Sequence, residues 1–210
     1  MRFLVVVVLL LTLVDVSWAK AKEDAVLRDT LRDLIASGDY ANALQRADAA
    51  LAQNADSALA MQYRAYALHQ LGRSGEARRA YEKTVELAPD NWWAHMNLGS
   101  LLASTGRFSE ALTAATRATE LKPDSKDAWR RVVRIQRDRR LFEKAKSAVV
   151  NAMGEGIDPA WCQAQLAELA WIANDRETAT KRWARAAELG FDAKAVAHGR
   201  RLVAFDEQIR

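Results

Sequence analysis

The sequence is short of the residues that would support several common architectures. It holds 9 Gly, 3 Pro and 1 Cys in 210 residues. So few turn-forming residues argue against an all-β fold. A single Cys excludes an intramolecular disulfide framework and a cysteine-built zinc site. With 31 Lys and Arg against 27 Asp and Glu, neither sign of charge dominates. Alanine is instead abundant, with 41 residues, and is the best helix former.

The first residues have the layout of a secretory signal peptide. Met1 and Arg2 precede a 12-residue apolar run, Phe3–Val14. Small residues then stand at the positions required for cleavage after Ala19 or Ala21. The run is short of the roughly 20 apolar residues that span a bilayer, although an uncleaved anchor remains the alternative. We therefore predict cleavage of residues 1–19 and export, with the bacterial periplasm as the expected location.

The remaining chain repeats with a period of 34 residues. The rows are 24–57, 58–91, 92–125, 126–159 and 160–193. Column residues recur at fixed offsets: Gly38, Gly72 and Gly106; Pro89 and Pro123; Ala43, Ala77, Ala111, Ala145 and Ala179. Apolar residues at helical spacing on either side of each glycine predict two helices per row. We interpret the column alanines as the points where paired helices approach closely.

This pattern resembles the tetratricopeptide repeat family, which has a 34-residue unit with small, large and proline positions at these offsets. Row three matches best, through Leu98, Gly99, Leu102, Gly106, Ala111, Ala118 and Pro123. Arg140 and Asn174 replace the column glycine in rows four and five, and Ala55 replaces the proline in row one. The resemblance implies an all-α solenoid of five helix-turn-helix repeats. We expect residues 194–210 to form a capping helix, because a terminal repeat otherwise exposes apolar surface.

No enzyme motif is present in the sequence. It lacks G-x-S-x-G, H-E-x-x-H and a phosphate-binding loop. The three histidines have no metal-ligand spacing, and Cys162 lies among Ala and Leu, which is typical of a core position. We expect no catalytic residue, no metal and no cofactor.

Row four carries an unusual concentration of positive charge. Residues 126–150 contain nine Lys and Arg and three Asp and Glu. Arg130, Arg134 and Arg137 are spaced i, i+4, i+7, so they share one helix face. A solvated charged face and an anion-binding surface are both consistent with this spacing.

The resemblance implies that first helices line an inner groove and places these arginines in it. The aromatic residues expected beside them are Tyr66, Trp93, Trp161 and Trp171. Asn97 stands where one branch of the family holds a chaperone carboxylate, but Gln62 and Tyr66 replace the other residues of that clamp, so that activity is not expected.

The sequence therefore predicts a non-catalytic adaptor or scaffold of the periplasm or cell envelope. It would bind a partner peptide or helix, with acidic residues expected in the partner. The alternatives are a self-assembling structural protein and an accessory subunit for anionic cell-wall or lipid components. Nucleic acid would fit the basic run, but export argues against it.

Overall fold

The computed structural model describes residues 20–197 and residue 199, and every regular element in this part of the chain is an α-helix. A first helix has residues 20–36 as its described part. The helices after it are α2 (Tyr40–Gln53), α3 (Ala58–Gln70), α4 (Ser74–Leu87), α5 (Trp92–Ser104), α6 (Phe108–Leu121), α7 (Lys126–Asp138), α8 (Phe142–Gly154), α9 (Pro159–Ile172) and α10 (Arg176–Glu188). The predicted signal segment, residues 1–19, lies outside the described residues.

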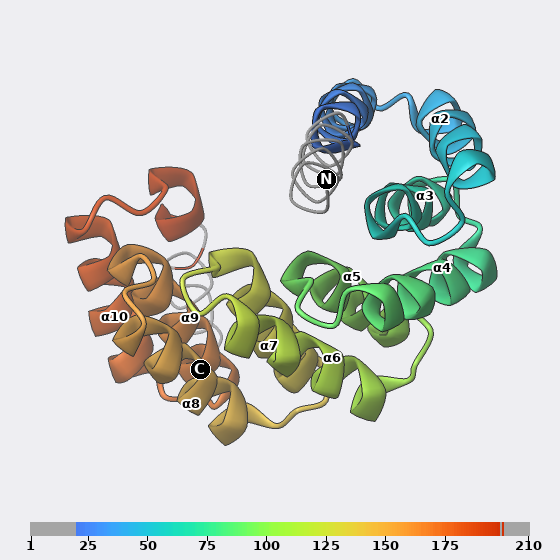
Figure 1. Cartoon of the computed structure of the whole chain (residues 1–210). Coiled ribbons are helices and arrows are strands. Elements are labelled where there is room, and N and C mark those ends of the chain that lie inside the picture. The colour runs from blue at the N-terminus through green and yellow to red at the C-terminus, as the bar shows by residue number, and fades with distance from the viewer. Residues whose placement is uncertain (1–19, 198, 200–210) are drawn as a thin grey trace, which may run out of the picture. The chain divides into compact units, whose positions relative to one another are not determined.

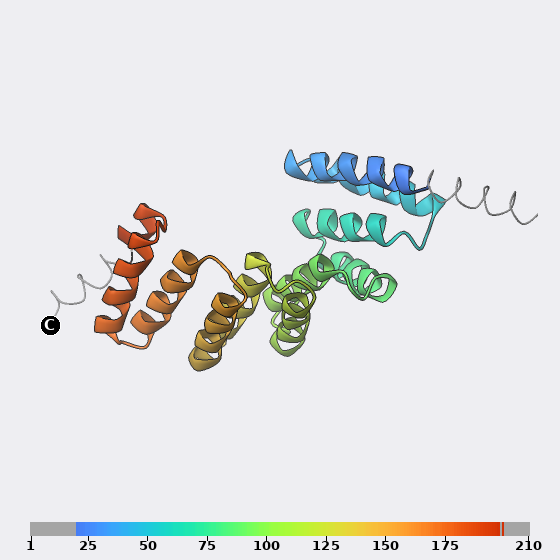
Figure 2. The same ribbon diagram turned by 60° about the vertical axis from the view of Figure 1, so that its left-hand side comes forward.

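The chain divides into two compact units after Pro89. The first unit contains the helices up to α4, and the second contains α5 to α10 (Figure 1). Within the second unit α5 packs on α6, α7 on α8 and α9 on α10, while α6 contacts α7 and α8 contacts α9. Both ribbon views show these partners as antiparallel hairpins (Figures 1 and 2). The predicted all-α helical-repeat solenoid is therefore confirmed.

The column that begins with Gly38 marks the turn between the two helices of each repeat. Gly38, Gly72 and Gly106 have φ angles of 79°, 76° and 79°. The two replacements adopt the same left-handed conformation, with φ of 56° at Arg140 and 62° at Asn174. Because this conformation strains a residue that carries a Cβ, the turn geometry of the repeat is retained at Arg140 against the local preference.

From α4 onward, the second helices of the repeats end in two different ways. Ala88 and Lys122 precede the prolines and have φ of −139° and −140° as the C-caps of α4 and α6. A following proline disfavours helical geometry, so these helices stop there. α8 and α10 are followed instead by Gly156 and Gly190, with φ of 79° and 84°. Two kinds of stop signal thus produce the same repeat length.

Small residues allow the paired helices to approach closely, as predicted. The column alanines Ala43, Ala77, Ala111, Ala145 and Ala179 are all fully buried. A Cβ added to Gly99 in α5 would lie 2.9 Å from the carbonyl oxygen of Ala111 in α6. The backbones of α5 and α6 therefore meet at a position where a side chain would have to displace the main chain.

The chain continues past α10 in a helix that includes residues 193–197 and 199. Val196 is 4% exposed, and a Cβ added to Gly199 would overlap the indole of Trp183. The described part of the predicted capping segment thus packs against the last repeat. Residues 198 and 200–210 of that segment lie outside the described residues.

In the ranges that the structure describes, none of the helices is both long and apolar enough to cross a bilayer.

Candidate functional site

The arginines of row four lie on α7, which has sharply distinct apolar and charged sides. Ser125 caps the helix by accepting a hydrogen bond from the Ala128 amide. Val132, Val133 and Ile135 are buried against neighbouring helices. Arg130 and Arg134 are exposed on another side, and Arg137 is partly exposed. Packing of the apolar side therefore fixes the position of α7, and with it the position of the arginines on the other side.

Two of the three arginines have carboxylate partners. Arg137 Nη1 donates to Glu168 Oε1 of α9 at 2.6 Å, and its Nε lies 3.7 Å from Asp138 Oδ1. Arg130 Nη1 lies 3.3 Å from Asp127 Oδ1, one turn earlier on α7. The Arg137–Glu168 bond connects the first helices of two successive repeats, so it fixes part of the surface that the arginines form.

Arg134 differs from both neighbours. It is exposed, and the described part of the chain gives it no hydrogen bond or ion pair. A guanidinium has five donors in a planar fork that matches a carboxylate. Of these three arginines, Arg134 is thus the one whose hydrogen-bond donors are available to another molecule.

Another basic side chain of α7 is also neutralised within the protein. Lys126 Nζ lies 3.0 Å from Asp158 Oδ2, at the start of α9. This hydrogen bond, followed by backbone hydrogen bonds near the α9 N-terminus, lowers the pKa of Asp158. Asp158 also accepts from the Ala160 amide and so caps α9. Part of the excess positive charge counted in the sequence is therefore already paired with carboxylates of the protein.

The aromatic residues expected beside the arginines differ in exposure. Trp171 is partly exposed and stands one turn from Glu168 on the same side of α9. Trp93 is partly buried against a cluster that includes Met96, Ala118 and Ala128. Trp161 is only 4% exposed, because α9 is apolar on most of its surface and is packed on several sides.

Asn97 and Tyr66 occupy different settings from these aromatic residues. Asn97 is 4% exposed, and its amide donates to the Trp93 carbonyl at 2.9 Å. Tyr66 belongs to the first unit, where its ring lies edge-on to Tyr40 with centroids 6.4 Å apart. On the accessible surface of the second unit, Arg137 of α7 is thus joined to Glu168 of α9, with Arg130 and Arg134 on the same side of α7 and Trp171 one turn beyond Glu168 on α9.

Cys162 lies in the interior, as its surroundings in the sequence indicate. It is fully buried, and burial raises the pKa of its thiol to about 11. The thiol is therefore protonated at neutral pH. Across the described residues, no group of three or more His, Cys, Asp or Glu side chains is placed to hold a metal ion.

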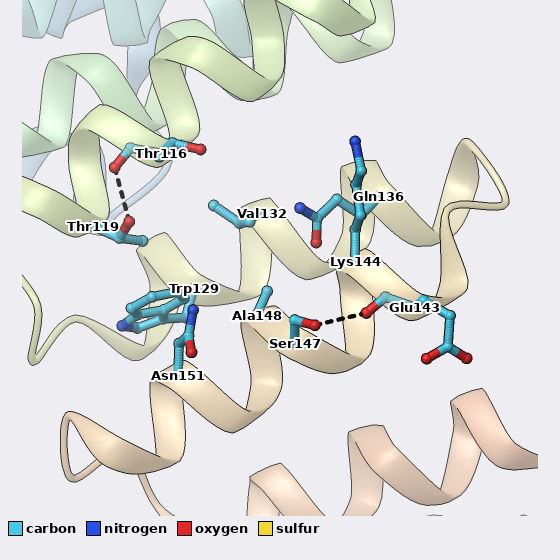
Figure 3. Close-up of a pocket in the computed structure, with 10 residues that line it drawn as sticks. All are labelled: Thr116, Thr119, Trp129, Val132, Gln136, Glu143, Lys144, Ser147, Ala148 and Asn151. Carbon is cyan, nitrogen blue, oxygen red and sulfur yellow. Dashed lines mark hydrogen bonds between the residues drawn. The ribbon is translucent and has the colours of Figure 1, made fainter.

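Sequence reasoning missed a hollow of about 400 Å³ on the second unit (Figure 3). Its walls come from α6 and α8 and its floor from α7. The lining residues are Thr116, Thr119, Trp129, Val132, Gln136, Glu143, Lys144, Ser147, Ala148 and Asn151. They are spread over three helices and follow no motif, so no sequence signal marks them as a group.

Comparison with known proteins agrees with the helical-repeat architecture. The tetratricopeptide repeat model matches residues 29–91, 70–126 and 96–153. Two curated relatives are the DnaJ homolog subfamily C member 3 of Gallus gallus, 30% identical over 120 residues, and the Hsp70-Hsp90 organizing protein of Triticum aestivum, 33% identical over 88 residues. These alignments cover 56% and 42% of this chain but only 24% and 15% of the relatives. The chain thus matches a quarter or less of either relative.

Solved structures share the fold at low sequence identity. YrrB, described as a TPR protein with an unusual peptide-binding site, is 18% identical with a TM-score of 0.65, over 83% of this chain and 90% of that chain. MamA from Desulfovibrio magneticus RS-1 is 17% identical with a TM-score of 0.67, over 79% and 94%. At this identity the likeness concerns the fold alone. Because the family model covers more than half of the sequence and the helices pack in the matching hairpins, the chain belongs to the tetratricopeptide repeat family.

Proposed function

We propose that this protein is a non-catalytic adaptor that binds an acidic segment of a partner protein on the surface formed by Arg130, Arg134, Arg137, Glu168 and Trp171. This set is called the arginine surface below. The observation that carries the proposal is the exposed guanidinium of Arg134, which has no partner among the described residues and lies between two arginines that already have carboxylate partners.

The geometry favours a carboxylate as the group recognised. An acidic side chain placed on Arg134 would find a planar donor fork, and charge-assisted hydrogen bonds contribute about 1.5–3 kcal/mol each. Arg130 and Arg137 would add long-range attraction while remaining tied to Asp127 and Glu168. The selectivity for an acidic partner would therefore come chiefly from one residue, with its neighbours increasing the association rate.

Trp171 supplies the apolar part of the recognition. Tryptophan and arginine are the residue types that most often dominate binding energy at protein interfaces. Trp171 is one turn from Glu168, whose carboxylate is held by Arg137. A segment with an apolar residue near its acidic residue would contact the indole and Arg134 together.

The known proteins lend this role general support. The Hsp70-Hsp90 organizing protein is named for organising two other proteins, and YrrB is described by its peptide-binding site. The periplasmic location rests on the signal-like sequence of residues 1–19 alone. A partner would accordingly be sought among exported proteins of the cell envelope.

The proposal is tested with a fluorescein-labelled peptide of repeated Gly-Glu-Leu units. In a chain that also carries Lys144→Glu, so that the hollow does not contribute, we expect Arg134→Glu to weaken its binding at least about tenfold, which corresponds to about 1.4 kcal/mol. Lys146→Glu makes the same charge change on an exposed residue of α8 and serves as the matched control. Unchanged affinity for Arg134→Glu, or an equal loss for Lys146→Glu, would remove the arginine surface from the site.

A further inference from the structure

We propose that the hollow between α6 and α8 is a second binding site, which takes an extended peptide segment with an apolar residue beside an acidic one. This site is distinct from the arginine surface. On α7 the hollow uses Trp129, Val132 and Gln136, whereas the surface uses Arg130, Arg134 and Arg137. At about 100° per residue, these two sets point to different sides of the helix. An adaptor with both sites could hold two partners at once.

One end of the hollow carries polar groups for which the described residues supply no partner. Lys144 is exposed and has no hydrogen bond or ion pair with the described residues. The buried amide oxygen of Gln136 likewise finds no hydrogen-bond partner within the described ranges. A buried oxygen without a hydrogen bond has lost its contact with water and is energetically unfavourable. A ligand that gives this amide a partner would recover part of that cost.

The charge at one end selects an acidic ligand. Figure 3 shows Gln136 and Lys144 together at one end of the hollow and Trp129 and Asn151 at the other. The Glu143 carboxylate is directed away from the remaining lining groups in this view. The ammonium of Lys144 is therefore left as the uncompensated charge facing the ligand, and a carboxylate is its complement.

The length and floor of the hollow fit a short extended segment. Trp129 and Gln136 are seven residues apart on α7, a rise of about 10 Å. Three residues of extended chain span about the same length. Val132 and Ala148 are apolar and lie between the two ends. A segment in the hollow would thus place one apolar side chain on this floor and main-chain amides near Gln136 and Asn151, whose side chains have both donor and acceptor groups.

The experiment uses the full chain with Arg134→Glu, so that the arginine surface does not contribute. The probe is the fluorescein-labelled peptide Gly-Leu-Glu-Gly with an amidated C-terminus, and the matched probe has Gln in place of Glu. Two exposed residues of the hollow are changed separately: Lys144→Glu reverses the charge, and Ser147→Phe fills the space. Lys146→Glu on the same helix lies outside the lining and is the control.

The expected result is measurable binding of the acidic probe, weakened at least about tenfold by Lys144→Glu and by Ser147→Phe and unaffected by Lys146→Glu. The probe with Gln should bind about tenfold more weakly. Absence of binding, or affinity that neither hollow variant changes, would overturn the second site. Equal binding of the two probes would overturn its preference for an acidic ligand. Because Arg134 is already replaced, none of these outcomes bears on the arginine surface.

Discussion

At the residue scale, Glu168 and Arg134 have opposite effects on the same surface. Glu168 occupies the guanidinium of Arg137 at 2.6 Å, with the two side chains 37% and 27% exposed. An acidic ligand must therefore compete with Glu168 for Arg137, whereas Arg134 is open. Glu168 consequently favours a ligand whose acidic residue sits at Arg134.

Replacing Glu168 with Gln should strengthen the binding of acidic ligands. The neutral amide keeps the shape of the side chain and releases Arg137, adding a second available guanidinium. We expect the Gly-Glu-Leu peptide to bind about three- to fivefold more tightly, the equivalent of about 0.7–1 kcal/mol. Fluorescence polarisation at low and high salt measures this, since an electrostatic gain should shrink as salt increases. A gain that is independent of salt would contradict this role for Arg137.

Cys162 gives a pH-dependent prediction. Its pKa of about 11 in the folded protein lies above the ordinary value of 9.0 for a thiol. The unfolded state therefore loses its thiol proton first, so this group stabilises the fold fully below about pH 8.5. That contribution declines as the pH rises towards 11. The thiol should react slowly with a disulfide reagent at pH 8 and rapidly after unfolding in urea. Equal rates in the two states would show that Cys162 is accessible in the native protein.

Arg140 is the residue where the repeat pattern and the local backbone preference conflict. Its φ of 56° is strained for a side chain with a Cβ, by about 1–2 kcal/mol. We expect Arg140→Gly to raise the free energy of unfolding by about 0.5–1 kcal/mol, because glycine gives back part of the gain as backbone entropy. Urea unfolding measures the change. The reverse substitution, Gly106→Ala, should lower stability by about 1 kcal/mol. A loss of stability in Arg140→Gly would contradict backbone strain at Arg140.

At the scale of the helices, the sequence predicts the hairpins well because each depends on local signals. The column glycines, the prolines and the buried alanines act within one repeat. In the structure the glycines lie in turns, the prolines follow helix ends and the alanines are buried between paired helices. Even Arg140 and Asn174 follow the column, since the packing of the flanking helices imposes the turn. Local patterns of this kind are readable without knowledge of distant contacts.

The close approach of α5 and α6 can be tested with two Gly→Ala substitutions that should change the stability of the protein in opposite directions. Gly75 in α4 has nothing within 4 Å of an added Cβ, whereas Gly99 has the Ala111 carbonyl oxygen at 2.9 Å. Gly75→Ala should stabilise the protein by up to about 1 kcal/mol through its helix propensity. Gly99→Ala should destabilise it, by about 1–3 kcal/mol from overpacking. Thermal unfolding of both variants compares them, and a stabilising Gly99→Ala would contradict the helix contact.

The candidate sites were less predictable, for two physical reasons. The spacing of Arg130, Arg134 and Arg137 indicates a shared face, but only the structure reveals that Glu168 of another repeat takes up Arg137. Likewise, Trp161 has a groove position by resemblance but is 4% exposed, because its exposure depends on how the rest of α9 packs. The hollow joins residues from α6, α7 and α8 without a motif. All three outcomes depend on contacts between repeats. The spacing of residues in the sequence does not reveal such contacts.

At the scale of the whole molecule, the proposed role requires a second protein rather than copies of this chain. A solenoid of short repeats presents an extended surface, and the residues of the proposed arginine surface come from two of its helices, α7 and α9. An adaptor should stay monomeric as its concentration rises, whereas a self-assembling protein should not. Size-exclusion chromatography with light scattering would distinguish the two.

The most direct test of the central claim is photo-crosslinking of the full chain in its cells of origin. A photoreactive benzoyl-phenylalanine replaces Arg130, at the edge of the arginine surface, and in a second strain replaces Lys146 as a control. We predict an adduct with another exported protein from position 130, lost when Arg134→Glu is added, and a different pattern or none from position 146. Identical adducts from both positions, or an adduct at 130 that survives Arg134→Glu, would contradict recognition of the partner by the arginine surface.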